Sequence, residues 1–251
     1  MSYWKKAEKK LQKQLIMQDK EIHILCTRPL NAALIAEAKQ KGFAIDVFSF
    51  IETEKIKTAA IELEINKAAS KNIVAVFTSM NAVEAVTETL AGQRPHWSIF
   101  CMGNTTKKLV TDYFGAESIT GTAADAAELA GKIAKDKFID EVIFFCGDIR
   151  RDELPAILSK NNIEVKEMLV YSTTLTAQSI EKKYAGILFF SPSAVQSFFS
   201  INVIPQTTTL FAIGKTTAEE INKYTTNTVI TGDKPGKENL LQKMMTYYNE
   251  S

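Results

Sequence analysis

The sequence predicts an α/β protein built on doubly wound parallel sheets, that is, sheets covered by helices on both faces. Short apolar runs of strand length alternate with segments of helical period along most of the 251 residues. This alternation is the pattern of a parallel sheet, because each return to the sheet needs a crossover helix. Hydrophobic residues make up 45% and charged residues 24% of the chain, as in ordinary globular proteins, and the length suffices for two compact domains.

Nine apolar runs are predicted to be strands. In chain order they cover residues 22–27, 43–48, 73–77, 98–102, 142–146, 163–169, 187–190, 209–213 and 228–230. Amphipathic helices are predicted between them. Pro29 and Gly42 mark the beginning and end of the first helix, and Val83, Val86 and Leu90 form the apolar stripe of another.

An internal repeat indicates that the chain contains two copies of one α/β plan. Three pairs of segments match in order: Phe-Thr-Ser-Met-Asn-Ala-Val at 77–83 with Phe-Phe-Ser-Pro-Ser-Ala-Val at 189–195, Ile-Phe-Cys-Met-Gly-Asn-Thr-Thr at 99–106 with Leu-Phe-Ala-Ile-Gly-Lys-Thr-Thr at 210–217, and Ile-Thr-Gly at 119–121 with Ile-Thr-Gly at 230–232. The offset is 112 positions for the first pair and 111 for the other two. Ordered matches at nearly one offset predict two similar domains.

The charge balance excludes a global electrostatic attraction to polyanions. Lys and Arg number 30 against 29 Asp and Glu, so neither nucleic acid nor a membrane surface is an expected partner. Residues 1–21 form a basic N-terminal extension, in which six lysines stand against Glu8 and Asp19 in the first twenty positions. Residues 21–251 carry a formal charge of −3. The extension has no apolar core of signal-peptide length, and we expect a cytoplasmic protein that binds any anion locally.

Metal and nucleotide chemistry are not expected. Cys26, Cys101 and Cys146 are far apart and form no CxxC motif, so we interpret them as reduced thiols. The two histidines, His23 and His96, lie in a strand-like run and beside a proline, which suits neither a metal centre nor a Ser-His-Asp triad. The glycine loops match neither a P-loop nor the Gly-x-Gly-x-x-Gly fingerprint, so no cofactor is predicted.

The candidate binding residues follow the predicted strands, where open α/β sheets bind ligands near helix N-termini. They are Arg28, Thr78, Ser79, Asn81, Gly103, Thr105, Gly147, Ser191, Ser193, Ala194, Gly214, Thr216 and Thr217. Each has a structural alternative, because Ser, Thr and Asn are preferred helix caps and an exposed arginine commonly forms a surface ion pair. Tyr171 also leaves a strand, and it is either a packing residue or the neutral proton donor of this set.

Eight segments in chain order carry a resemblance to a known family. They are Ile-Leu-Cys-Thr-Arg-Pro at 24–29, Val-Phe-Thr-Ser-Met-Asn-Ala-Val at 76–83, Cys-Met-Gly at 101–103, Cys146-Gly147 with Arg151, Val-Tyr-Ser-Thr at 170–173, Phe-Ser-Pro-Ser-Ala-Val at 190–195, Ala-Ile-Gly-Lys-Thr-Thr-Ala at 212–218, and Pro235 with Glu238, Leu240 and Leu241. Together they resemble the uroporphyrinogen-III synthase family. The likeness covers about residues 22–245 and leaves out the lysine-rich start.

The resemblance implies a particular domain organisation. Two flavodoxin-like domains with a cleft between them would be joined by a two-stranded linker. Domain one would combine residues 22–46 with 173–251, and domain two would cover 53–164. The linker strands would be 47–52 and 165–172.

The resemblance also implies the reaction. The family cyclises the linear tetrapyrrole hydroxymethylbilane to uroporphyrinogen III, with loss of water and inversion of ring D through a spiro intermediate, and needs no cofactor. Tyr171 would be the general acid, and the candidate residues at the strand ends would bind substrate. We expect a monomer, and the resemblance leaves open a transient contact with hydroxymethylbilane synthase.

Two other classes of function remain as alternatives. A non-catalytic two-domain module could close around a small anionic ligand inside the cell. A regulatory α/β domain fused to a nucleic-acid-binding element is disfavoured, because nothing resembles a helix-turn-helix with a basic face and the body of the chain is slightly acidic.

Overall fold

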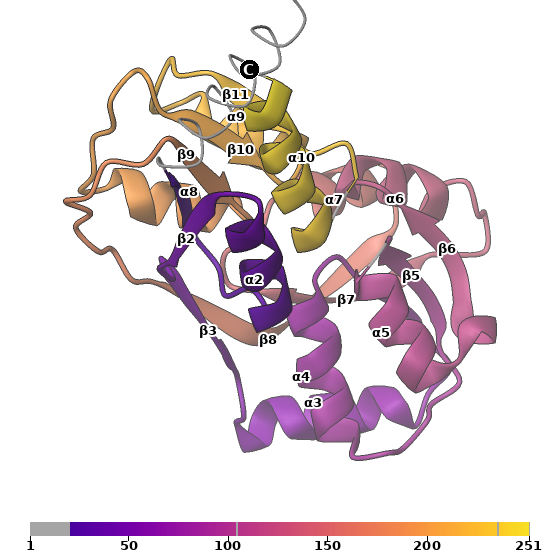
Figure 1. Ribbon diagram of the computed structural model, residues 1–251. Helices are drawn as coiled ribbons and strands as arrows, with labels where there is room; N and C mark the ends of the chain where they lie inside the picture. The colour runs from indigo at the N-terminus through magenta and orange to yellow at the C-terminus, as the bar shows by residue number, and fades with distance from the viewer. Residues whose placement is uncertain (1–20, 104, 235, 251) are drawn as a thin grey trace, which may run out of the picture. The chain divides into compact units, whose positions relative to one another are not determined.

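The computed structural model describes residues 21–103, 105–234 and 236–250 (Figure 1). The first twenty residues of the predicted basic extension, and Pro235 of the family resemblance, lie outside the described residues. The chain divides into two compact units. Unit 1 comprises Met1–Ile51 and Leu175–Ser251, and unit 2 comprises Glu52–Thr174.

Unit 1 is a five-stranded parallel sheet in the order β11-β10-β9-β1-β2. Its elements are β1 (Ile22–Cys26), α2 (Ala32–Gln40), β2 (Phe43–Val47), β9 (Gly186–Phe189), α8 (Pro192–Phe199), β10 (Thr209–Ala212), α9 (Lys215–Ile221), β11 (Val229–Thr231) and α10 (Lys237–Glu250). Numbered within the unit, the strand order is 2-1-3-4-5, which is the flavodoxin-like arrangement.

Unit 2 contains a six-stranded sheet in the order β3-β8-β7-β4-β5-β6. Its elements are β3 (Ile51–Lys55), α3 (Ala59–Ala69), β4 (Val74–Phe77), α4 (Met80–Leu90), β5 (Ser98–Met102), α5 (Thr105–Phe114), the short 3-10 helix η1 (Ala116–Ser118), β6 (Ile119–Ala123), α6 (Ala126–Ile133), β7 (Glu141–Gly147), α7 (Glu153–Lys160) and β8 (Glu164–Leu175). The strands from β8 to β6 are parallel.

The two units have the same spatial order of strands, but the first strand along the chain differs between them. The order β8-β7-β4-β5-β6 in unit 2 matches β2-β1-β9-β10-β11 in unit 1. The sequence repeat relates β4, β5 and β6 to β9, β10 and β11, and the register agrees: Phe77 pairs with Cys101 as Phe189 pairs with Ala212. Unit 2 is therefore a circular permutation of unit 1. Strands β7 and β8 end unit 2, whereas their counterparts β1 and β2 begin unit 1.

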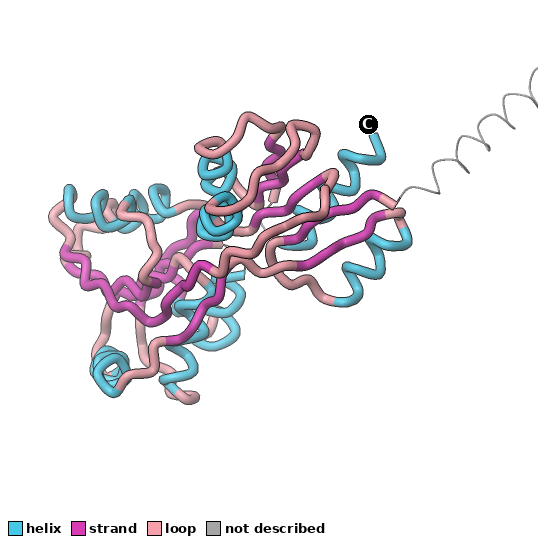
Figure 2. The backbone as a smooth tube through the Cα atoms, turned by 90° about the vertical axis from the view of Figure 1, so that its left-hand side faces the viewer, coloured by secondary structure: helices cyan, strands magenta, loops and turns pink. Residues whose placement is uncertain are grey.

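Each sheet is covered on both faces, as the sequence predicts, and Figure 2 shows helices on both sides of the strands within each unit. In unit 2, Phe77 packs on one face with residues of α3, α4 and α5, whereas its neighbour Val76 packs on the other face with residues of α6 and α7. In unit 1, Leu25 faces α8 and α9, and Ile24 faces α2 and α10. Strands buried on both faces explain the continuous apolar runs in the sequence.

All nine predicted strands are present, and their ends agree within one residue except that β8 continues to Leu175. The nine runs did not include β3 and β6. Strand β3 is almost entirely exposed, so it carries no apolar signature. The predicted linker strand at 47–52 is wrong for its middle: residues 48–50 are not in a strand, because the Ser49 hydroxyl donates to the carbonyl of Ile51 (2.7 Å) and the Phe50 ring is buried in the core of unit 1.

The chain passes between the units at the beginning of β3 and at the end of β8. These two strands are neighbours at one edge of the six-stranded sheet. Phe50 accepts a hydrogen bond from the amide of Thr176 (3.0 Å), and Val170 accepts one from the amide of Ile56 (3.0 Å). Since the partner number falls as the strand number rises, β3 runs antiparallel to β8. Within the described part of the chain, no helix has the length and apolar character needed to cross a membrane.

Candidate active site

The carboxyl edge of the unit 2 sheet gathers the predicted residues of the first copy. Strands β7, β4 and β5 are adjacent and parallel, and Phe77 pairs with both Phe145 and Cys101. The residues that follow these strands therefore lie at one edge. They are Thr78 and Ser79 after β4, Gly103 after β5, and Gly147 at the end of β7.

Tyr171 lies at the same edge, on β8. A register shift between Cys146 and Gly147 brings Gly147 opposite Tyr171 in the pairing of β7 with β8. The Tyr171 side chain is nearly buried, with 9% of the residue exposed. Burial raises the pKa of the Tyr171 phenol above its usual value, although a hydrogen bond with Ser79 acts in the opposite direction. A neutral phenol with one polar partner therefore stands beside the loop that begins α4.

Ser79 has the capping role that its residue type predicts. Its backbone is extended, and its hydroxyl accepts a hydrogen bond from the amide of Asn81 (3.2 Å). The same hydroxyl is the partner of Tyr171. Ser79 thus links the first turn of α4 to the phenol, so capping and a role at the site coexist in one residue.

The loop after β7 is organised by Asp148. Its carboxylate accepts hydrogen bonds from the amides of Ile149 and Thr173, both at 2.8 Å, and its own amide donates to the carbonyl of Tyr171 (3.3 Å). Two of these bonds connect the loop after β7 to β8, at Tyr171 and at Thr173. The main chain that carries the phenol is therefore held in place by neighbouring residues.

Arg150 forms ion pairs rather than standing open for a ligand. Its guanidinium contacts Glu167 on β8 and Asp152 before α7, and its side chain is 25% exposed. Arg150 therefore forms the ion pairs that are the common structural role of an arginine near the surface.

The three cysteines are free and buried. Burial raises the pKa of each thiol to about 11. At neutral pH they are protonated, so none of them is an activated nucleophile. Cys146, one residue before Gly147, packs with the α6 and α7 face of the sheet.

Unit 1 presents the second copy of the loops at the carboxyl edge of its own sheet. The Ser191 hydroxyl accepts a hydrogen bond from the amide of Ala194 (3.2 Å) and caps α8, as Ser79 caps α4. Gly214 is the N-cap of α9, and its carbonyl accepts from the amide of Thr217 (3.1 Å). Ala194 and Thr217 are each only 2% exposed, so their side chains belong to the core and not to an open surface.

Two cations lie near the end of β1 in unit 1. Arg28 follows β1, and Lys237 begins α10 and donates from its Nζ to the carbonyl of Pro29 (2.7 Å). Burial and the charge of Arg28 lower the pKa of Lys237. This edge of unit 1 therefore carries positive charge, which the sequence indicated through Arg28 alone.

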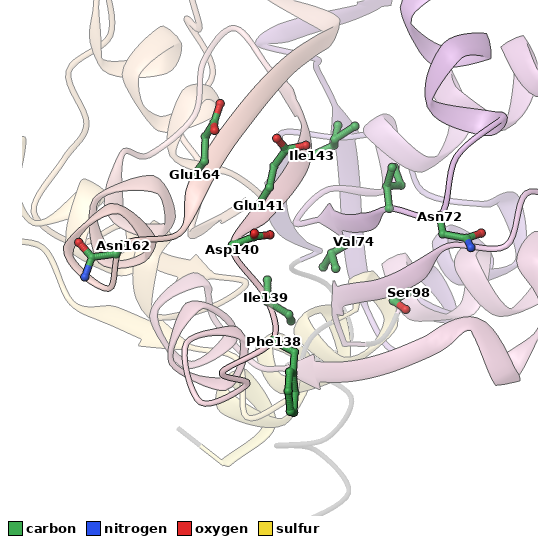
Figure 3. A pocket seen from close by; sticks show the side chains of 11 residues that line it. Asn72, Val74, Ser98, Phe138, Ile139, Asp140, Glu141, Ile143, Asn162 and Glu164 are labelled. Atoms are coloured by element: carbon green, nitrogen blue, oxygen red, sulfur yellow. The ribbon is translucent and has the colours of Figure 1, made fainter.

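A cavity of about 650 Å³ lies at the opposite edge of the unit 2 sheet (Figure 3). Its walls come from the amino ends of β4, β5, β7 and β8, and include Val74, Ser98, Glu141 and Glu164. None of the predicted site residues lines it. Within the described ranges, no group of three or more His, Cys, Asp or Glu side chains could hold a metal ion.

Comparison with known families identifies the family of this chain. The model of the family described as uroporphyrinogen-III synthase HemD matches residues 32–242. The chain belongs to the uroporphyrinogen-III synthase family. Members of this family are lyases of porphyrin and heme biosynthesis, and the chain shares that function. The resemblance noted in the motifs is thereby confirmed. No curated protein matches the sequence.

Solved uroporphyrinogen-III synthase structures have the same fold. A mutant synthase from the extremely thermophilic bacterium Thermus thermophilus aligns with a TM-score of 0.69 at 13% identity, covering 91% of this chain and 98% of the other. The uroporphyrinogen-III synthetase of Helicobacter pylori 26695 aligns with a TM-score of 0.60 at 17% identity, covering 90% and 99%. These likenesses confirm the predicted α/β fold class.

The structure brings the predicted residues of this synthase into two groups, one per unit. In unit 2, Tyr171 pairs with Gly147 and interacts with Ser79. Half-buried or exposed residues complete the two edges: Thr78, Asn81, Gly103 and Thr105 in unit 2, and Arg28, Ser193 and Thr216 in unit 1.

Sequence reasoning missed Asp148 and Lys237. Asp148 follows Gly147 at a strand end, and a Gly-Asp pair in that position is a recognisable turn signal. Lys237 gave no comparable signal, because its contact with Pro29 joins residues 208 positions apart.

Proposed function

We propose that this uroporphyrinogen-III synthase closes hydroxymethylbilane with Tyr171 as the proton donor. The observation that carries the assignment is a nearly buried phenol whose partner, Ser79, caps the eleven-residue helix α4. Burial keeps the phenol neutral at physiological pH, so it has a proton to give. After donation, the Ser79 hydroxyl and the positive end of the α4 dipole favour the phenolate.

In the proposed reaction, Tyr171 gives one proton and later receives one. The phenol Oη gives its proton to the hydroxyl group on the ring A methylene, the C–O bond breaks, and water leaves with the bonding electrons. Ring A becomes an electrophilic azafulvenium cation, which the substituted α-carbon of ring D attacks to give a cationic spiro intermediate. The bond from that carbon to the methylene of ring C then breaks and leaves an azafulvenium cation on ring C. The free α-carbon of ring D attacks this methylene and loses its proton. That proton restores the phenol.

We propose that the capped helix N-termini bind the carboxylates of the substrate. Each pyrrole carries an acetate and a propionate, and free amides in the first helical turn favour anions. Ser79 of α4 and Ser191 of α8 are half-buried caps at the carboxyl edges of the two sheets. Since the same bilane closes unaided to the uninverted isomer, holding one conformation should contribute more than creating a nucleophile.

Isomer analysis tests this function directly. The full chain is supplied with hydroxymethylbilane, the products are oxidised, and the uroporphyrin isomers are separated. We expect isomer III, at a rate proportional to protein concentration. Isomer I alone, formed at the spontaneous rate, would contradict the proposal and favour a non-catalytic anion-binding module.

A charge placed at Ser191 should separate binding from capping. Asp caps helices as well as Ser does, so Ser191→Asp should preserve α8 while repelling substrate carboxylates. We expect KM to rise about tenfold, equivalent to about 1.4 kcal/mol, with the melting temperature unchanged. Ser191→Ala should instead lower stability by about 1 kcal/mol through loss of the cap.

The matched control is Ser200→Asp, which puts the same charge at the other end of the same helix, where Ser200 is the C-cap. We expect its KM to remain close to that of the unmodified enzyme. Equal KM values for Ser191→Asp and Ser200→Asp would remove Ser191 from the binding surface.

We further propose that the enzyme acts as a cytoplasmic monomer and receives its substrate by transient contact with hydroxymethylbilane synthase. The instability of the bilane supports this proposal, because a substrate that closes unaided to the wrong isomer is best transferred quickly. Sedimentation of the enzyme alone and with hydroxymethylbilane synthase would test both statements.

A further inference from the structure

Gly147 occupies a position where any other residue would collide with Tyr171. A Cβ built on Gly147 would lie 2.4 Å from Cζ, 2.5 Å from Cε2 and 2.8 Å from Oη of the Tyr171 ring. These contacts are all too short for real atoms. Gly147 is not among the positive-φ glycines, which are Gly42, Gly92, Gly115 and Gly236. The ring, and not the backbone conformation, therefore requires glycine here.

The ring is held from several directions. Its main chain is fixed by pairing with β7 and by the bond from the Asp148 amide to the Tyr171 carbonyl (3.3 Å). The Asp148 carboxylate binds the amide of Thr173, two residues further along β8 (2.8 Å). The hydroxyl lies close enough to Ser79 for that side chain to lower the pKa of the phenol. The ring of Tyr171 thus packs directly on the backbone of Gly147.

We propose that Gly147 is a positioning residue for the reaction, because the absence of a side chain there sets the ring of Tyr171 across the end of β7 and its hydroxyl at Ser79. The catalytic meaning of this contact rests on the proposed function of Tyr171. A methyl group at residue 147 needs a separation of about 3.5–4 Å from ring carbons, so the ring must move by more than an ångström. The movement carries the hydroxyl away from Ser79.

The variant Gly147→Ala should therefore affect turnover more than binding. Misplacement of a reacting group by about 1 Å costs on the order of 100-fold in rate, so we expect kcat to fall by about that factor with KM changed less than about threefold. The matched control is Gly131→Ala in α6, where a Cβ meets nothing within 4 Å. Its kcat and KM should equal those of the unmodified enzyme.

The pKa of the Tyr171 phenol can be measured independently of activity. With ¹³Cζ-labelled tyrosine, the resonance missing from Tyr171→Phe assigns Tyr171, and its titration reports the pKa. Burial is the main cause of the raised pKa, so a ring displaced toward solvent in Gly147→Ala should titrate closer to the ordinary tyrosine value. The titratable groups whose charge affects the phenol are Cys146, on the other face of the sheet, and Asp148 in the loop after β7. Gly131→Ala should leave the titration unchanged.

Double variants separate positioning from general packing. In the Tyr171→Phe background, Gly147→Ala should cause no further loss of kcat, because the hydroxyl is already gone. An equal loss in both backgrounds, or a Gly147→Ala enzyme with unchanged kcat and Tyr171 titration, overturns the proposal. If Gly147→Ala does not fold, adding Tyr171→Ala should restore folding by removing the collision, and a double variant that still fails to fold also overturns it.

These results are distinguishable from a failure of the proposed function. If Tyr171→Phe kept full turnover, the acid role would fail, yet the ¹³C titration would still decide whether Gly147 seats the ring.

Discussion

Replacing Tyr171 with Phe should lower kcat by about 100-fold, within the range that general acid catalysis contributes. The phenyl ring preserves the packing over Gly147 and removes only the proton and the bond to Ser79. Loss of that bond should lower the free energy of unfolding by about 1 kcal/mol, so the variant stays folded. Steady-state kinetics with hydroxymethylbilane measure the change. The enzyme-made product should remain isomer III, since the choice of isomer depends on how the substrate is held.

Tyr248→Phe is the matched control for this variant. Tyr248 is a partly buried phenol whose raised pKa also comes mainly from burial, and its hydroxyl donates to the carbonyl of Ala185 (2.6 Å). It lies at the amino edge of the unit 1 sheet, away from the proposed site. We expect normal kcat. Similar rates for the two variants would exclude Tyr171 as the acid.

Replacing Phe198 with Ala should destabilise unit 1 by about 3–5 kcal/mol. Phe198 on α8 is 1% exposed. Its ring makes edge-to-face contacts with Phe50, Phe189 and Phe199 at centroid distances of 5.2, 5.4 and 5.0 Å. Truncation leaves a cavity and removes three aromatic pairs that stabilise beyond their buried area. The loss is a large part of the total stability of an ordinary domain.

Urea unfolding followed by circular dichroism measures this effect as a lower midpoint. Phe138→Ala is the control, because Phe138 is 95% exposed and its truncation should change stability by less than about 0.5 kcal/mol. Equal midpoints for the two variants would show that the ring cluster around Phe198 does not stabilise unit 1.

Much of the fold could be predicted because its strands are buried on both faces. Runs such as those of β4 and β9 are apolar without interruption, and the helices between them have clear periodicity. Strand β3 has no apolar run that would predict it, because four of its five residues are exposed. The likeness of β7 and β8 to β1 and β2 was also hidden, because the permutation reverses their place relative to the repeated segments.

The candidate site could be predicted where residue type and strand end coincide. Ser79 and Ser191 follow strands and cap helices, which local sequence indicates. The pairing of Gly147 with Tyr171 depends on a register shift, and it joins residues 24 positions apart, so no local pattern reveals it. The burial of Thr217 was equally invisible in the sequence, because its neighbour Thr216 is similar in type and only the packing of α9 distinguishes them.

The permuted arrangement dictates an order of events during synthesis on the ribosome. Strands β1 and β2 emerge first, but the rest of their sheet begins only at Gly186, after the whole of unit 2 has been made. Until then β1 lacks the neighbour that covers its open edge, whereas unit 2 is one continuous stretch and has all its strands as soon as Thr174 is available. The nascent chain therefore has all the strands of unit 2 before it has those of unit 1. The pair formed by β1 and β2 keeps an unpaired strand edge until β9 has been made.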